Sequence, residues 1–510
     1  MDFILNDQPR TYEGRPDLSV LTWLRDGVGL MSPKDGCSGE GVCGCCTVLL
    51  DGAPRLSCRM TMKDLEGRRL TTLEGLPSFE QDAFADAFVL KGGVQCGFCT
   101  PGLVMRASAF LKKHPKPTRA EITQAITPNL CRCTGYVKVV DSVACAAEAL
   151  RSGQPIATPH GTGAIGTRHP KYTAREAVLG RRVFVGDMRE AGQLRGALRF
   201  SDHPRAKVLR VDTSRALQVP GVVKILTASD IPGQRFIGSI HHDWPVLVAE
   251  GETTRYIGDV LASVAAETDE AAREAAALIQ VDYEVLEPVT DLFEALQPEA
   301  PQLTPTGNVL HRAEVRVGDA EAALEASAHV YRQRFTTQRI EHAFLEPEAT
   351  LAKPWVKDGQ RGLKVFSCSQ GVYEDRHQLA LVMALPKSRV NVIQVQNGGG
   401  FGGKEDLTTQ AHAALLAWHT DRPVLVQLTR QESLRMHPKR HPFVLDYAVG
   451  CDATGQLTAL VVTLHSDSGA YASVGSAVLE RAVSHAAAAY YVPNVHITGT
   501  AVITNNVANY

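Results

Sequence analysis

The chain has 510 residues, enough for about three domains of ordinary size, each with its own core. Its 53 basic residues nearly cancel its 55 acidic ones, so charge gives no reason to expect nucleic acid or an anionic membrane as a partner. The opening residues lack the basic flank and apolar core of a signal peptide, and no window reaches the roughly 18 apolar residues of a membrane helix. We therefore expect a soluble, cytoplasmic enzyme or enzyme subunit.

Short strands and turns are predicted at the start of the chain. Residues 2–6 read as a strand, residues 7–16 as a turn region and residues 18–26 as a helix. Residues 46–58 read as a hairpin whose turn is Asp51-Gly52.

Cysteines are crowded into the first part of the chain. Ten of the twelve lie between Cys37 and Cys145. A disulfide scaffold would need an exported protein, so crowded cysteines in a cytoplasmic chain indicate metal or redox chemistry.

The first set is Cys37, Cys43, Cys46 and Cys58, three from one glycine-rich loop and one from the far side of the hairpin. Plant-type ferredoxins supply three ligands of a [2Fe–2S] cluster from one loop as C-x4-C-x2-C. Glycines let such a loop curl tightly and turn its amide groups toward the sulfurs. Here the first gap is five residues, which leaves Cys45 as a spare thiol that could replace a neighbouring ligand. A zinc site is the alternative.

Helical periodicity follows. Helices are predicted over residues 79–92, 101–114, 118–126 and 139–153. Proline and glycine then gather in residues 152–167, which indicates a linker. Beyond it, strands at 221–226 and 260–267 alternate with helices such as 269–280, which indicates a large α+β region.

The second set is Cys96, Cys99, Cys131 and Cys133, a C-x2-C pair and a C-x-C pair separated by a helical insert. A proline two positions after Cys99 suits a first helical turn, so the first pair is expected at a helix N-terminus, where the dipole favours thiolate. Two helical hairpins would bring both pairs to one end of a small bundle. Zinc is again the alternative, but beside a ferredoxin-like first half we expect a second [2Fe–2S] cluster. Cys145 is expected to be a core residue.

These patterns together resemble a known family. CGCCTVLLDG (43–52), GGVQCGFCTPG (92–102) and NLCRCTGY (129–136) resemble the iron–sulfur half of the molybdenum hydroxylases, the xanthine dehydrogenase and aldehyde oxidoreductase family. The resemblance continues to the end of the chain, for example through NGGGFGGKED (397–406). No flavin domain separates the linker from the expected molybdenum domain, as in aldehyde oxidoreductases. RMHPKRHPF (435–443) is most similar to the selenium-dependent xanthine dehydrogenase branch.

The resemblance implies an α+β multidomain fold. A β-grasp, plant-ferredoxin-like [2Fe–2S] domain is expected in residues 1–76, a four-helix [2Fe–2S] bundle in 77–151 and a linker in 152–167. An α/β hammerhead-like domain of the aldehyde oxidase and xanthine dehydrogenase type is expected in 168–300. The first part of a molybdopterin-binding domain, incomplete here, is expected in 301–510.

The glycine-rich loop around Phe401 is expected to approach the molybdenum. Five glycines there would let backbone amides reach a ligand at a range that side chains would block, although the motif alone is also typical of an ordinary β-turn. The resemblance places Phe401 and Gly402 against the oxygen side of the metal. It makes Glu405 the catalytic carboxylate that orients a purine-like substrate, the alternative being a surface glutamate.

Three further residues match cofactor contacts of the family. Gln370 matches the glutamine that hydrogen-bonds a molybdenum ligand, while Gln95 and Cys133 match groups that contact the pterin. His342 and His441 are expected to be structural.

The implied function is hydroxylation of an electron-poor carbon in a purine, another N-heterocycle or an aldehyde. Electrons would pass from molybdenum–molybdopterin through the second and first [2Fe–2S] clusters to an external acceptor, such as a flavin subunit, with no FAD in this chain. The alternatives are an electron-transfer subunit or fragment without catalysis of its own, and a zinc-stabilised interaction module. A homo- or hetero-oligomer is expected from the family.

The chain departs from the family pattern after residues 501–510. The family continues with an arginine-bearing loop, further pterin-binding segments and a glutamate general base, and no Gly-x-Gly-Glu motif occurs in residues 168–510. We therefore expect either a fragment or a second, molybdenum-binding polypeptide that completes the site. The apolar residues 495–504 are then expected to present an unpaired strand edge.

Overall fold

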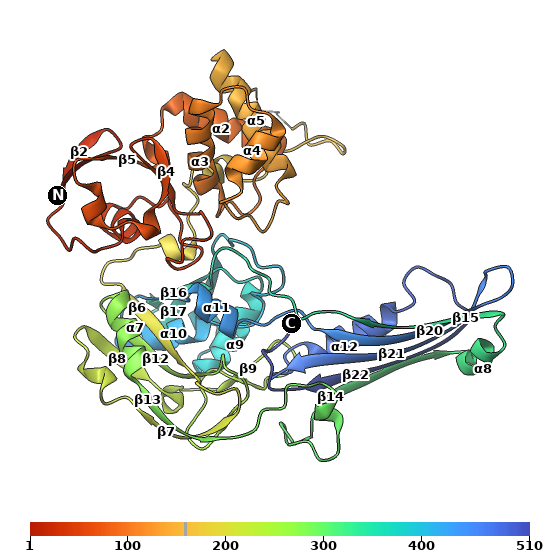
Figure 1. The fold of residues 1–510 in the computed structure, drawn as a ribbon. Coiled ribbons are helices and arrows are strands. Elements are labelled where there is room, and N and C mark those ends of the chain that lie inside the picture. Colours follow the sequence, from red (N-terminus) through yellow and green to blue (C-terminus); the bar gives the residue numbers. More distant parts are fainter. Residues whose placement is uncertain (158–160) are drawn as a thin grey trace. The chain divides into compact units, whose positions relative to one another are not determined.

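The computed structural model describes residues 1–157 and 161–510 (Figure 1). The chain divides into two compact units. The first unit comprises Met1–Arg189 together with Ala343–Pro347 and Val395–Gly399, and the second unit holds the remainder. Within the described residues, no helix combines the length and the apolar character needed to cross a bilayer.

A five-stranded sheet opens the first unit, in the order β2-β1-β5-β3-β4. The predicted hairpin forms, with Asp51 and Gly52 both at positive φ between its strands. The predicted turn region instead contains strand β2, paired antiparallel with β1, and the predicted helix is a short α-turn, α1, followed by a π-helical turn over Trp23–Val28. The bounds are β1 Asp2–Leu5, β2 Gln8–Thr11, α1 Val20–Thr22, β3 Thr47–Leu50, β4 Ala53–Leu56 and β5 Arg69–Thr71.

Four helices follow this sheet, close to the predicted ranges. Thr118 and Glu121 form a capping box that fixes the start of the third of them, and Gly92, at φ 69°, ends the first. Apolar positions at helical spacing are buried in one shared core. The helices are α2 Ser78–Lys91, α3 Thr100–Lys113, α4 Arg119–Ile126 and α5 Val137–Ser152.

Chain segments beyond the predicted linker also belong to the first unit. Helix α6, Ala174–Val178, packs against α2 and α3, so the unit extends to Arg189, whereas we expected the next domain to begin at residue 168. From much later in the chain, the Gly398 amide donates to Glu346 Oε2 at 2.6 Å within the same unit.

The second unit is built around a seven-stranded sheet in the order β18-β17-β16-β19-β6-β12-β8. Strand β12 is buried along its whole length, between β6 and β8. Helix α7 packs on β6 and β12, and α10 packs on β16 and β19. The strands are β6 Leu194–Phe200, β8 Val222–Leu226, β12 Val260–Ala266, β16 Ala349–Lys357, β17 Gln360–Ser367, β18 Val390–Gln394 and β19 Val424–Gln427. The helices of this region are α7 Asp269–Leu278, α9 Val372–Val382, α10 Gln410–Thr420 and α11 Arg430–Met436.

Two smaller sheets accompany it, in the orders β11-β7-β13 and β10-β9. Their strands are β7 Ala206–Asp212, β9 Phe236–Ile237, β10 Trp244–Pro245, β11 Thr253–Thr254 and β13 Gln280–Val285.

A long five-stranded sheet completes the second unit, in the order β14-β22-β21-β20-β15, with α12 packed along β14 and β22 (Figure 1). The expectation of an unpaired edge at residues 495–504 is wrong. Strand β22 lies inside the sheet, antiparallel to β14 and parallel to β21, because β14 comes from a distant part of the chain and covers the edge that local sequence left open. The bounds are β14 Val309–Val317, α8 Ala320–Glu325, β15 His329–Thr336, β20 Phe443–Cys451, β21 Leu457–Gly469, α12 Gly475–His485 and β22 Asn494–Ile503.

Candidate functional site

The four thiols of the first cysteine set converge in the first unit. Cys37 contacts both Cys43 and Cys58, and Cys46 contacts Cys58. Hydrogen bonds from Cys43 and Cys58 lower the pKa of the Cys37 thiol. The loop before β3 and the end of β4 thus bring together the four residues grouped from their spacing.

Cys45, the spare thiol, is 1% exposed and lies beside this set. The sulfur contacts run Cys43–Cys37–Cys58–Cys46, and Cys45 contacts Cys43 at one end. The Cys45 amide points at Cys43 Sγ, with 3.5 Å between nitrogen and sulfur. An amide so placed offsets negative charge on the sulfur of a cluster ligand.

The second cysteine set also converges, at the N-terminus of α3 and in the segment between α4 and α5. The Sγ atoms of Cys96 and Cys133 are 3.5 Å apart. The hydrogen bond with Cys99 lowers the pKa of Cys131 to about 6, and Thr134 Oγ1 lies 3.1 Å from Cys131 Sγ. Helical hairpins therefore join the two pairs, as predicted from their spacing.

Asn129 joins the two cysteine sets, a role that sequence reasoning missed. Its Nδ2 donates to the Gly44 carbonyl at 2.7 Å, and the following amide, Leu130, donates to the Cys43 carbonyl at 2.9 Å. Gly44 has φ 74°, and a Cβ there would stand 2.5 Å from the Pro128 carbonyl oxygen. Only glycine permits this approach. In the sequence, the one indication of this role was that Asn129 lies two residues before Cys131.

In the second unit, Gln370 and Glu405 are hydrogen-bonded to each other. Gln370 Nε2 donates to Glu405 Oε1 at 2.9 Å, and Gln370 Oε1 accepts from the Gly402 amide at 3.0 Å. The backbone amide of Gln370 in turn donates to the Lys404 carbonyl at 2.9 Å. Burial raises the pKa of Glu405. Two side chains 35 positions apart in sequence, on the loops after β17 and β18, thus form one polar group.

The glycine-rich loop has the conformation that its composition suggested. Phe401 has φ 56° and is 49% exposed, and Gly402 has φ 91°. A Cβ on Gly400 would stand 2.1 Å from Gln370 Oε1, so glycine is required there for the glutamine to lie on the backbone.

Two buried carboxyls flank the Gln370–Glu405 pair, and neither was foreseen. Ser369 Oγ donates to Asp375 Oδ2 at 2.5 Å, and Ser473 Oγ donates to Asp406 Oδ1 at 2.6 Å. Burial raises the pKa of both aspartates to about 7. Each aspartate is thereby suited to remain protonated in the interior.

A buried charged cluster lies beneath the same loop. His437, fully buried, approaches Glu341 at 2.8 Å and Glu348 at 3.1 Å. Burial acts to lower the pKa of His437, but the two carboxylates raise it overall. Lys439 is 2.6 Å from Glu341, and Lys404, 2% exposed, donates to Cys368 Sγ at 3.5 Å. Lys404, which precedes Glu405, thus lies in a buried polar environment.

The two histidines expected to be structural are both buried. Burial lowers the pKa of His441 to about 4, so it is neutral near pH 7. His342 lies beside the glycine-rich loop, with Nε2 3.8 Å from where a Cβ on Gly402 would stand.

The remaining predicted residue, Gln95, is exposed immediately before Cys96 in the first unit. Gln95 and Cys133 thus belong to the first unit, and Gln370, Phe401 and Glu405 to the second.

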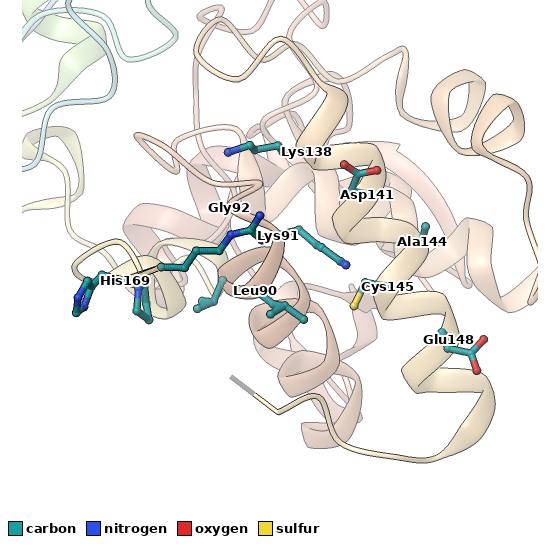
Figure 2. A pocket seen from close by; sticks show the side chains of 12 residues that line it. Leu90, Lys91, Gly92, Lys138, Asp141, Ala144, Cys145, Glu148 and His169 are labelled. Carbon is teal, nitrogen blue, oxygen red and sulfur yellow. The ribbon is translucent and has the colours of Figure 1, made fainter. Parts of the chain in front are cut away.

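A separate hollow of about 890 Å³ lies in the first unit between the end of α2 and α5 (Figure 2). Its lining includes Lys91, Lys138, Cys145 and Glu148. Cys145 is half-buried, packs against the core of the first unit as expected, and directs its sulfur toward α2. The eight cysteines of the two sets are not part of this lining.

Four family models match the chain in order. A 2Fe-2S iron-sulfur cluster binding domain matches residues 3–71, and a [2Fe-2S] binding domain matches residues 72–144. The a/b hammerhead domain of aldehyde oxidase and xanthine dehydrogenase matches residues 179–287, and a molybdopterin cofactor-binding domain matches residues 303–510.

Similar proteins agree with this order. The nicotinate dehydrogenase large molybdopterin subunit of Eubacterium barkeri is 36% identical over 342 residues, covering 67% of this chain and 79% of that subunit. The chain belongs to the molybdenum hydroxylase family. The aldehyde oxidoreductase of Megalodesulfovibrio gigas is 31% identical over 507 residues, covering 95% of this molybdenum hydroxylase chain and 55% of the relative. The solved aldehyde oxidoreductase from Desulfovibrio gigas superposes on the whole chain with a TM-score of 0.94 at 28% identity, covering 58% of that structure. The chain therefore spans about half the length of these aldehyde oxidoreductases.

The α+β multidomain fold expected of a molybdenum hydroxylase is confirmed, with two [2Fe–2S]-binding domains ahead of a molybdopterin-binding domain. The residues present fit these groups. Each cysteine set offers four converging sulfurs, the donors that a [2Fe–2S] cluster takes. The second Nε2 hydrogen of Gln370 has no acceptor in the described part of the chain, so it can serve a molybdenum ligand.

Proposed function

We propose that this chain is the iron–sulfur and substrate-recognition part of a molybdenum hydroxylase that acts on a purine, another N-heterocycle or an aldehyde. The observation that carries the proposal is the Gln370–Glu405–Gly402 group, in a chain that also brings eight cysteines together as two fours. The printed name of the Eubacterium barkeri relative, a nicotinate dehydrogenase subunit, favours a heterocycle over an aldehyde.

In this proposal the cysteine sets hold the two clusters. Cys37, Cys43, Cys46 and Cys58 hold the first, and Cys96, Cys99, Cys131 and Cys133 hold the second, with Cys45 outside both. Gln95 and Cys133 contact the pterin, which places the second cluster next to the cofactor. When bound, the molybdenum–pterin group supplies oxygen transfer and takes up two electrons, which the clusters pass to an external acceptor.

In this proposal the side chains of the second unit bind and orient the substrate and the cofactor. Gln370 donates one amide hydrogen to Glu405 and directs the other toward the metal site, while Phe401 and Gly402 form the adjacent wall. Glu405, whose pKa burial raises, shares hydrogen bonds with the ring nitrogens of a heterocycle and stabilises charge that develops on the ring. A protonated carboxyl can donate to a ring nitrogen, and an ionised carboxylate can accept from a ring N–H.

A second candidate is an iron–sulfur electron-transfer subunit that is inactive alone. It is favoured by the two converging cysteine sets, which fit electron transfer by themselves. The complex is a cytoplasmic homo- or hetero-oligomer, and a flavin-bearing subunit fits the place of the acceptor.

Metal analysis and activity separate the candidates. The purified chain is analysed for iron, labile sulfide and molybdenum, and its visible spectrum is recorded. Turnover of xanthine, nicotinate and an aldehyde is then measured with a dye acceptor, with and without co-expressed neighbouring gene products. Two clusters with molybdenum and turnover support the hydroxylase, and two clusters without molybdenum in every combination support the electron-transfer subunit. A folded, iron-free, colourless chain contradicts both.

A further inference from the structure

The turn that carries Cys96 is covered by the segment that follows the linker. Helix α6 lies against this turn, since a Cβ on Gly97 would stand 2.6 Å from Ala177 Cβ. Gly97 has φ 88°, which allows the turn to pass this close to the helix. The rings of Phe98 and Phe184 pack edge to face at 5.1 Å on the same segment. The position of the segment over the second cysteine set is therefore fixed by core packing.

Arg182 belongs to this segment, and its charge is close enough to Cys96 for the two to interact. Its amide donates to the Glu176 carbonyl at 3.2 Å, which ties its backbone to the end of α6. Its Nη1 is buried and has no hydrogen-bond acceptor among residues 1–157 and 161–510. Burial lowers the pKa of Arg182, and the nearby Cys96 charge opposes that shift. A buried guanidinium nitrogen without an acceptor is costly, so an anion near Nη1 would stabilise Arg182.

Lys171 adds a second cation at the same place. Burial and the charge of Arg182 lower its pKa, and the charge of Cys96 again acts in the opposite direction. The other titratable groups that act on Arg182 are the exposed Glu176 carboxylate and the exposed phenol of Tyr172. Two cations thus lie close enough to Cys96 for their charges to act on it, with one solvent-exposed carboxylate near them.

We infer that Arg182 sets the reduction potential of the second [2Fe–2S] cluster, with Lys171 adding a smaller effect. The inference rests on the proposed ligand set Cys96, Cys99, Cys131 and Cys133. A [2Fe–2S] cluster with four thiolates is an anion, and its reduction adds one electron and no other atom. A fixed cation nearby stabilises the reduced form more than the oxidised form, and the partial burial of Arg182 reduces screening of its charge by water and salt. The cluster next to the pterin is then the better electron acceptor.

A redox titration of the intact, cofactor-loaded protein, followed by electron paramagnetic resonance, tests this inference. Removal of the Arg182 charge in R182Q should lower the midpoint potential of the second cluster. At a fixed solution potential, a tenfold fall in the ratio of reduced to oxidised cluster corresponds to a shift of about 59 mV in the midpoint potential of a one-electron couple. R182K should restore most of the wild-type value, and K171Q should give a smaller shift in the same direction. The signal that C131S removes identifies the second cluster.

Arg181 provides the matched control. It neighbours Arg182 but is exposed, and its guanidinium donates to Gln81 Oε1 at 3.3 Å. R181Q should leave both potentials unchanged, and none of these variants should move the potential of the first cluster.

Two results would overturn the inference, and they are distinguishable. If wild-type protein shows two clusters but R182Q matches R181Q, or shifts both clusters equally, the role of Arg182 is wrong while the proposed function stands. If wild-type protein lacks a second cluster signal, the ligand assignment itself is wrong. Should R182Q fail to fold, K171Q decides, because Lys171 is exposed and its replacement leaves the core intact; an unshifted potential in K171Q would then refute the electrostatic account.

Discussion

At the scale of single residues, the candidate site joins groups whose chemistry depends on burial. Glu405 lies where burial raises its pKa, and it already shares a hydrogen bond with Gln370. Cys131 is surrounded by hydroxyl and thiol donors that favour its thiolate. In both places the surroundings of the side chain, and not its residue type alone, prepare it for its proposed role.

Glu405→Gln should slow turnover of a heterocycle by about 10²- to 10³-fold in kcat, the usual cost of losing one preorganised transition-state contact. Molybdenum and iron contents should remain those of the wild type, because the side chain contacts Gln370 and no cysteine. Steady-state kinetics and metal analysis of the completed enzyme measure both. Glu374→Gln is the control, since Glu374 accepts from Gln378 and stands outside the Gln370 group. Unchanged kinetics in E405Q would refute the substrate role.

Cys131→Ser should remove the paramagnetic signal of one cluster and leave the other. The reason is that Cys131 contacts Cys99 in the second set, whereas the first set closes through Cys37 and Cys58. Iron content should fall by about half. Loss of both signals together would argue against two independent sites.

At the scale of elements, the connections between cysteine-bearing loops matter more than the regular elements. Strand β3 and helix α3 each begin directly after a cysteine, and the segment before α5 carries Cys131 and Cys133. The hydrogen bonds of Asn129 and Leu130 to the loop of the first set hold the two sets in register. Helix propensity cannot encode such a junction, because its bonds run between loops.

Gly44→Ala tests this junction. A side chain at φ 74° and 2.5 Å from a carbonyl oxygen should cost about 2 to 5 kcal/mol from backbone strain and overpacking. Both the thermal midpoint of the first unit and the iron content should therefore fall. Gly52→Ala is the matched control, because Gly52 has φ 77° with nothing within 4 Å and should lose only the backbone part, about 1 to 2 kcal/mol. Equal midpoints for the two variants would show that the loops are not in close contact.

At the scale of the whole molecule, each unit is assembled from segments far apart in sequence. The first unit recruits residues 343–347 and 395–399, and the last strand, β22, lies between β14 and β21. The second unit also encloses carboxyls such as Asp375, which has no exposed area. Such groups make the stability of the fold depend on pH.

Asp375 should make the second unit more stable in acid. Burial raises its folded pKa to about 7 from its ordinary value of 3.8, so the native state binds the proton more tightly than the unfolded state. Its contribution is fully present below pH 3.8 and is lost as pH rises toward 7, at no more than about 1.4 kcal/mol per pH unit. Asp375→Asn should flatten this part of the profile of unfolding midpoint against pH. Parallel profiles for the two proteins between pH 4 and 7 would contradict the assignment.

Much of the first unit was predictable from the sequence. The helices near 79–92, 101–114, 118–126 and 139–153 form as expected, because apolar periodicity and caps are local properties. The spacing of the cysteines sufficed to group them into two fours, since a short loop or helical hairpin limits which sulfurs can meet. The strand at residues 8–11 was missed because all four of its side chains are exposed and show no alternation.

Local patterns by themselves determined the α+β composition, the two cysteine sets and the glycine-rich loop of this protein. Only the tertiary structure decided the Gln370–Glu405 hydrogen bond, the enclosure of β22, the burial of Asp375 and Asp406, and the position of Arg182 beside Cys96. The physical reason is the distance along the chain over which each effect acts. Propensity, capping and loop closure act over a few residues, whereas burial and charge pairing depend on whichever distant segments the packed core brings together.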